Sequence, residues 1–314
     1  MPRWWNPGTS ITQNKTAAVY PDPVMTSSLA TFLALSVDGV SYGMMLFLIS
    51  VGLTITLGVM RVVNLAHSAF AMIGGYLALW AMQYAGLGFF VAIPLAVLGT
   101  MLVGTALERT LYRWVYSANG LGQLLMTIGL AFILSAVFKN LAGMQLQSLP
   151  IPESLRGNWT LGTISVSAYR LFALATGLLI AFGIWLGLEC TAFGARLRAA
   201  VDNPRMARCV GIDVPLVFSI TFAIGCGLSG LGGALASQML PIEPYYGLKY
   251  LVLVLIVVAA GGLGSLKGSL YAGLLLGVVD TLGRYYIPAL GAFMIYLAVL
   301  AILLIRPQGL AGRA

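Results

Sequence analysis

The fold is decided by residues 191–211, TAFGARLRAAVDNPRMARCVG, a basic segment that separates two long apolar runs. It carries four arginines, Arg196, Arg198, Arg205 and Arg208, although charged residues make up only 8% of the chain. Loops that stay in the cytoplasm are enriched in Lys and Arg. The loop of residues 190–214 is therefore expected on the cytoplasmic side of a membrane.

Local signals predict two short helices in this loop. Thr191 can cap a first helix that runs on from Phe193. Asn203 and Pro204 are typical of the start of a second helix, and Gly211 suits its C-terminal stop. The prediction is a helix–turn–helix lying roughly parallel to the membrane.

Composition places most of the chain in lipid. Hydrophobic residues make up 60% of the 314 residues, and the mean hydropathy is +0.95. Soluble domains are about 45–50% apolar and about 25% charged. The net charge of +8 is explained by cytoplasmic loops, so nucleic-acid binding is not expected. Three cysteines without a CxxC pair and one histidine make a structural zinc site unlikely to form.

Apolar intervals without charges predict an all-α polytopic membrane protein with about eight to nine transmembrane helices, including short or broken segments. The intervals are 39–60, two within 62–107, 114–138, 171–188, 214–242, 250–266, 268–279 and 285–305. The short piece between Lys267 and Arg284 either crosses the membrane or is re-entrant.

The arginines also predict the orientation and the domain limits. Residues 1–28 form a non-spanning N-terminal extension, residues 29–306 the transmembrane domain, and residues 307–314 a cytoplasmic tail. With nine crossings, the loop of residues 142–169 lies outside and is expected to be an ordered loop or a hairpin.

Three blocks resemble the permease family of branched-chain amino-acid ABC importers, the LivH-like permeases. The blocks are GVSYGMMLFLISVGLTITLGVMRVVNLAHSAFAMIGGYLA at 39–78, FGARLRAAVDNPRMARCVGIDV at 193–214 with the glycine-rich spans that follow, and LIRPQGLAG at 304–312. The resemblance implies an ABC importer permease architecture and a multi-pass protein of the bacterial cytoplasmic (inner) membrane.

The resemblance also implies partners. These are a second, LivM-like permease, two ABC ATPase subunits that bind ATP and Mg, an external or periplasmic substrate-binding protein, and membrane lipid. Residues 191–211 would dock on an ATPase through Phe193, Gly194, Arg196, Arg198, Ala199, Ala200, Asn203, Pro204, Arg205, Ala207 and Gly211. The alternative is a surface helix that holds anionic lipid head groups through its arginines.

The family's NFAHGE pattern reads NLAHSA at residues 64–69, so a carboxylate of the pattern is missing. Asn64, His67 and Ser68 are expected near the translocation pathway. For His67, the alternatives are a hydrogen-bonded packing residue and a proton relay. Asp280 and Arg284 are spaced i, i+4 and are expected to form an ion pair.

No ATP-binding motif GxxxxGK[ST] occurs in the sequence; the most similar stretch is GGLGSLKGS. The chain is therefore predicted to be a transport subunit without enzyme activity or a cofactor of its own. It would translocate a branched-chain or hydrophobic amino acid by alternating access, with urea, short amides, or aromatic or small carboxylates as alternative cargo. A stand-alone secondary transporter or a membrane enzyme would need mid-membrane charges or catalytic groups that the sequence scarcely offers.

Overall fold

The computed structural model describes residues 28–60, 63–112, 114, 119–161 and 164–312. The elements in these ranges are α1 (Ser28–Met60), α2 (His67–Gln83), α3 (Phe89–Leu107), the π-helical η1 (Glu108–Tyr112), α5 (Gly120–Ala142), the 3-10 helix η2 (Glu153–Leu155), β1 (Asn158–Leu161), β2 (Ile164–Ser167), α6 (Ala168–Glu189), α7 (Ala192–Asp202), α8 (Pro204–Cys209), α9 (Val214–Ala236), α10 (Tyr246–Gly261), α11 (Leu266–Tyr286), the 3-10 helix η3 (Pro288–Phe293) and α12 (Met294–Ile305). The expected extension of residues 1–28 lies outside the described residues, except for Ser28.

The polytopic helical membrane fold is confirmed. Among the described residues, six helices are long and apolar enough to cross a membrane, and the number rises to seven if the bent pair α10–α11 counts as one span. This is fewer than the eight or nine that were expected. The difference arises because α2 has only 17 residues and because α10 and α11 are joined by a bend of 119°.

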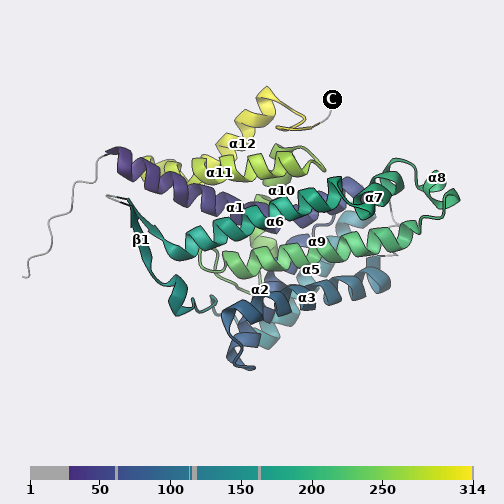
Figure 1. Cartoon of the computed structure of the whole chain (residues 1–314), viewed down its shortest axis with the longest axis horizontal. Coiled ribbons are helices and arrows are strands. Elements are labelled where there is room, and N and C mark those ends of the chain that lie inside the picture. Colours follow the sequence, from purple (N-terminus) through teal and green to yellow (C-terminus); the bar gives the residue numbers. More distant parts are fainter. Residues whose placement is uncertain (1–27, 61–62, 113, 115–118, 162–163, 313–314) are drawn as a thin grey trace, which may run out of the picture.

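Helix α1 forms the centre of the bundle. In the membrane-spanning stretch of α1, 78% of the residues are buried, whereas the corresponding share in α6 is 11%. Its apolar run Met44–Ile49 is packed against the neighbouring helices and is at most 2% exposed. Figure 1 shows α1 between α11 on one side and α6 and α9 on the other. Helix α1 is therefore the core helix of the bundle, and α6 lies on its outside.

Two pairs of glycines let α1 and α11 touch backbone to backbone. A Cβ atom added at Gly43 would lie 2.4 Å from the carbonyl oxygen of Gly273, and one added at Gly277 would lie 2.4 Å from the Cα of Gly43. Gly39 packs in the same way against Val278. Small residues at spacing GxxxG allow this close approach in membrane helices.

Helix α11 extends over 21 residues, well beyond the short apolar piece expected from the sequence. Asp280 does not end it, because its carboxylate is paired with Arg284 within the same helix. The turn before α11 uses Gly262 and Gly264 with φ of 97° and 79°, a region that favours glycine. The C-terminal segment packs onto this turn, where Leu310 N donates to Ala260 O at 2.8 Å.

The two ends of the bundle differ. At one end, β1 and β2 form an antiparallel hairpin in register Asn158↔Ser167, next to the start of α1. At the opposite end lie α7 and α8 (Figure 1). The hairpin that was expected within residues 142–169 is therefore confirmed as local structure, and it lies far from the basic segment.

Candidate functional site

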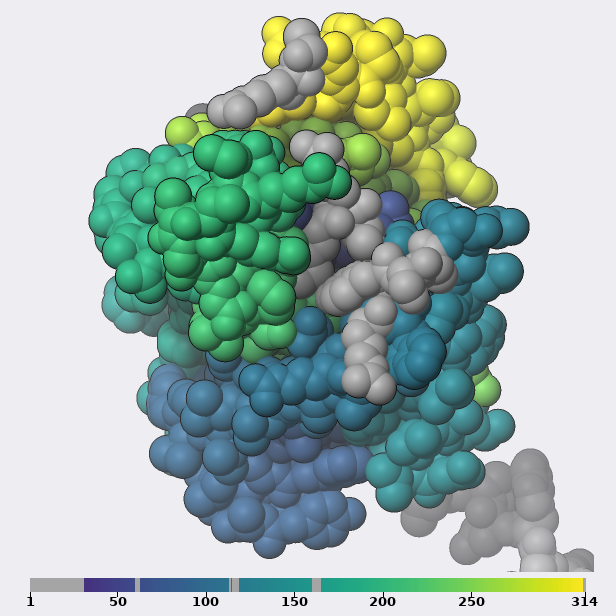
Figure 2. Space-filling view, turned by 90° about the vertical axis from the view of Figure 1, so that its right-hand side faces the viewer, coloured from purple at the N-terminus to yellow at the C-terminus, as the bar shows by residue number. Residues whose placement is uncertain are grey.

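The basic segment is a helix–turn–helix built on capped termini, as predicted. Thr191 Oγ1 accepts a hydrogen bond from Gly194 N at 3.2 Å, and Asn203 Oδ1 accepts one from Met206 N at 3.1 Å. Pro204 occupies the first turn of α8, where its missing N–H costs nothing. Gly211, with φ of 83°, ends α8. Figure 2 looks at this end of the molecule and shows the green residues of the loop as a raised patch below the yellow C-terminal helix.

A small apolar core holds the two short helices together. It is formed by Ala200, Ala207 and Val214, which are at most 3% exposed. Gly194 is also buried, and a Cβ atom there would lie 2.1 Å from Leu188 O. Of the expected docking residues, Gly194, Ala200 and Ala207 therefore face inward and shape the loop, so they cannot present side chains to a partner.

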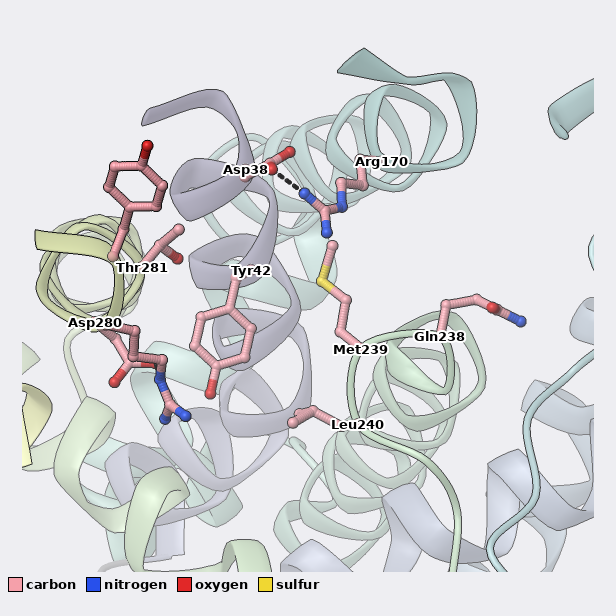
Figure 3. Close-up of a pocket in the computed structure, with 10 residues that line it drawn as sticks. Asp38, Tyr42, Arg170, Gln238, Met239, Leu240, Asp280 and Thr281 are labelled. Atoms are coloured by element: carbon pink, nitrogen blue, oxygen red, sulfur yellow. Dashed lines mark hydrogen bonds and ion pairs between the residues drawn. The ribbon is translucent and has the colours of Figure 1, made fainter. Parts of the chain in front are cut away.

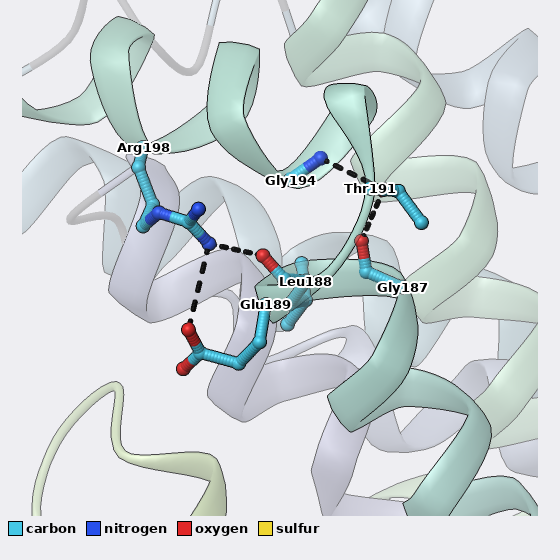
Figure 4. A network of polar contacts seen from close by, with 6 residues as sticks. All are labelled: Gly187, Leu188, Glu189, Thr191, Gly194 and Arg198. Carbon is cyan, nitrogen blue, oxygen red and sulfur yellow. Dashed lines mark hydrogen bonds and ion pairs between the residues drawn. The ribbon is translucent and has the colours of Figure 1, made fainter.

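Arg198 is exposed, but its guanidinium is bound to the end of α6. Its guanidinium donates to the main-chain oxygen of Leu188 and lies 3.8 Å from the carboxylate of Glu189 (Figure 4). Both acceptors belong to the last turn of α6. A cation at the C-terminus of a helix is favourable because the carbonyls there carry partial negative charge. Arg198 therefore connects α7 to the end of α6.

The outer surface of the loop is basic, with two apolar side chains that the sequence analysis missed. Arg196, Arg205 and Arg208 are exposed, together with Ala199, Asn203, Pro204 and Gly211, whereas Phe193 is half-buried. Met206 of α8 is 61% exposed, and Val210, which directly follows α8, is 74% exposed. The sequence does carry a signal for this exposure: both apolar residues lie close to Arg205 and Arg208 in or directly after a helix of only six residues, which is too short to bury every apolar side chain.

Asn64, His67 and Ser68 come together at the N-terminus of α2, and all three are buried. Asn64 Oδ1 accepts from Tyr112 Oη at 2.8 Å and from Ala66 N at 3.1 Å. Ser68 Oγ donates to Gly247 O on α10 at 2.6 Å. The cluster therefore ties α2 to η1 and α10.

His67 packs closely against Gly52 of α1. A Cβ atom added at Gly52 of α1 would lie 2.4 Å from its Nε2 atom, and its ring contacts Phe70 edge-on at 5.7 Å. Neither ring nitrogen has a hydrogen-bond partner among the residues that the structure describes. The expected hydrogen-bonded packing histidine is thus found packed but without the hydrogen bond. A role of these residues in the pathway stays a prediction, because none of the three lines the two cavities described next.

A cavity of about 620 Å³ opens at the end of the bundle opposite α7 and α8 (Figure 3). The predicted pair of Asp280 and Arg284 is confirmed here, with Arg284 Nε 2.8 Å from the carboxylate. A second ion pair, Asp38 with Arg170, joins α1 to α6 and was not predicted. Its members lie 132 residues apart (170 − 38), so only the tertiary fold reveals it. Together the two pairs place four charges around one cavity.

A second, larger cavity of about 1380 Å³ lies among α1, α6, α7, α11 and the C-terminal segment. Its lining is mainly apolar, with Arg198, Glu189, Asp202 and Lys267 at the end near the loop. It flanks the loop but carries none of the residues expected in the pathway.

Known proteins resemble this chain over nearly its whole length. The permease protein LivH of the high-affinity branched-chain amino acid transport system of Salmonella typhimurium is 26% identical over 304 residues, 92% of this chain and 98% of its own length. The corresponding BraD protein of Pseudomonas aeruginosa is 28% identical over 302 residues, 90% of this chain and 96% of its own. A probable LivH protein of Methanocaldococcus jannaschii is 27% identical over 286 residues, covering 86% and 90%.

A solved structure, PsaBC from Streptococcus pneumoniae in complex with Fab, covers 85% of this chain and 89% of that chain with 13% identity and a TM-score of 0.48, a likeness too distant to bear on function. A family model described as "Branched-chain amino acid transport system / permease component" matches residues 35–305. This range contains the central helix, the basic loop, the buried cluster at α2 and both ion pairs of the cavity. The chain is therefore a member of the permease family of branched-chain amino acid ABC transporters.

Proposed function

We propose that this chain is one permease subunit of an ABC importer that carries an apolar amino acid into the cell. The proposal is supported by the family, whose curated members are permease proteins of branched-chain amino acid transport. The observation that carries it is a capped helical loop that displays exposed arginines at one end of a membrane bundle. A subunit of this kind is suited to receive force from a neighbour.

In the proposed complex a second, LivM-like permease completes the pathway, and two ATPase subunits bind ATP and Mg. A substrate-binding protein delivers the cargo from outside the bacterial cytoplasmic membrane. Arg196, Arg205 and Arg208 would contact an ATPase, with Met206 and Val210 packing into its surface. Asn64, His67 and Ser68 would lie beside the pathway and hold α2 against α1 and α10. Closure of the ATPase pair would move the loop, so that the pathway opens to one side of the membrane and then to the other.

The coupling role is tested by charge reversal on the outer surface of the loop. Arg205→Glu and Arg208→Glu remove cations that face solvent, so the bundle itself should insert normally. Arg198→Glu is the weaker test, because it also breaks the contact with Leu188. The matched control is Arg156→Glu, an exposed arginine at the other end of the bundle.

We expect the two loop variants to lose at least about tenfold in ATP-driven uptake and in co-purification with the ATPase, since close charge pairs at an interface contribute about 1.5–7 kcal/mol. Arg156→Glu should retain both. Normal uptake by both loop variants at equal membrane levels would refute the coupling role. The cargo is tested separately by calorimetric titration of the cognate binding protein with leucine, urea, short amides and aromatic carboxylates. Binding of leucine alone supports the proposed substrate.

A further inference from the structure

The cavity at the end of the bundle opposite α7 and α8 has a balanced set of charges. Its polar lining includes Asp38, Arg170, Asp280 and Arg284, that is, two carboxylates and two guanidiniums. The ion pairs bring together α1, α6 and α11, and Tyr42 of α1 lies between them (Figure 3). Met239 and Leu240, from the segment after α9, form an apolar wall. The volume of about 620 Å³ is typical of a small-molecule site.

Asp280 is the unusual member of this set. Its side chain is 3% exposed, and only one of its oxygens is paired with Arg284. The other oxygen, Oδ1, is buried and has no hydrogen-bond partner within the described part of the chain. A buried acceptor of this kind is costly unless something donates to it, and ionisable groups at membrane depth are often functional. An unpaired carboxylate oxygen at a cavity wall points to a ligand with a donor group.

The second ion pair offers the complementary group. Arg170 uses one nitrogen for Asp38, and a guanidinium carries five N–H donors in a planar fork. Its side chain is 38% exposed, so an incoming carboxylate can reach it. The Tyr42 hydroxyl lies on the Asp280 side of the cavity and can donate or accept. The cavity thus presents an acceptor, a cationic fork and an apolar wall.

We propose that this cavity binds the ammonium and carboxylate groups of a zwitterionic, apolar amino acid as it enters the permease. Asp280 Oδ1 accepts hydrogen bonds from the ammonium group, Arg170 donates to the carboxylate, and Met239 with Leu240 contacts the side chain. Because the four charges cancel, a neutral zwitterion fits without adding net charge to the membrane domain. The inference rests on the proposed function, since it names a recognition site for the cargo of that importer.

The test measures saturable binding of radiolabelled L-leucine to the complete permease–ATPase complex in nanodiscs, without the binding protein. Two analogues complete the set: 4-methylpentanoate, which lacks the ammonium, and isoamylamine, which lacks the carboxylate. Asp280→Asn should lower the affinity for L-leucine and for isoamylamine at least tenfold, to about a tenth of the wild-type value or less. Its affinity for 4-methylpentanoate should stay within about threefold of the wild type. Arg170→Gln should lower the affinity for L-leucine and for 4-methylpentanoate and leave the affinity for isoamylamine unchanged. Tyr42→Phe removes a single hydroxyl group and should lower the affinity for L-leucine only a few fold.

Lys139→Gln and Glu153→Gln are matched controls, because neither residue lines the cavity. Each complex is checked for ATPase co-purification, and uptake of leucine by the wild-type complex tests the proposed function independently. The proposal is overturned if the wild-type complex binds none of the three compounds, or if Asp280→Asn and Arg170→Gln bind them as the controls do. It is also overturned if both variants bind leucine normally but lose stimulation by the binding protein, since the cavity would then be a docking surface.

Discussion

Replacement of Gly277 by alanine tests the glycine contact that sets the distance between α1 and α11. The added Cβ atom would lie 2.4 Å from both Gly43 Cα and Gly43 N and 2.5 Å from Gly39 O. Ordinary contact begins at 3.4 Å, so the helices must separate by about 1.0 Å (3.4 − 2.4) at this point. All three obstructing atoms belong to backbone, so no side-chain rotation relieves the clash. Overpacking of this kind costs about 1–3 kcal/mol, and we expect about 2–3 kcal/mol here.

The measurement is thermal unfolding in detergent. Unfolding is monitored through the exposure of Cys226, which then reacts with a thiol-reactive fluorophore. Cys226 is buried, whereas Cys190 and Cys209 are exposed and are first replaced by serine. At roughly 2 °C per kcal/mol for a chain of this size, the midpoint should fall by about 4–6 °C. Gly129→Ala on α5 is the control, because nothing lies within 4 Å of a Cβ atom there. Equal midpoints for the two alanine variants would refute the packing argument.

Three further predictions concern the loop. Asn203→Ala removes the cap of α8 and should cost about 1 kcal/mol, so that backbone amides of α8 exchange about fivefold faster by mass spectrometry, while Asn203→Ser keeps the normal rate. Gly194→Val places a side chain against Leu188 O and should reduce uptake at least about tenfold at an unchanged membrane level; uptake at the wild-type rate would contradict the close approach. A membrane-impermeant maleimide should label Cys190 and Cys209 in inside-out vesicles only, and labelling in intact spheroplasts would reverse the proposed orientation.

The sequence predicts the local features of the loop well, because helix-capping residues form hydrogen bonds with backbone groups that are close to them in the sequence. Thr191, Asn203 and Gly211 act through backbone groups two or three residues away, so their types alone determine where α7 and α8 begin and end. Which residues face outward is less predictable. Ala199 and Ala200 are adjacent and chemically identical, yet one is exposed and the other is packed against Val214, which belongs to the next helix.

Features that depend on distant segments were missed or misjudged. The apolar interval 268–279 is shorter than α11, because Asp280 interrupts the interval although it is buried in the bundle and neutralised by Arg284 within the same helix. The pairing of Asp38 with Arg170 brings together two helices whose contact no local pattern encodes. One alternative for His67 was a hydrogen-bonded packing residue, but neither of its ring nitrogens has a hydrogen-bond partner among the described residues.

The guanidinium of Arg198 connects α7 to the main-chain oxygen of Leu188 at the end of α6, while the other end of the loop continues through Asp213 into α9. Within this chain the α6 span is 11% buried and the α9 span is 56% buried. The free energy needed to shift a helix grows with the apolar surface it must uncover. Under the proposed coupling role, a displacement of the loop would therefore move α6 at a lower free-energy cost than α9. The other end of α6 carries Arg170, so such a movement would act on the ion pair that Arg170 forms with Asp38 of α1.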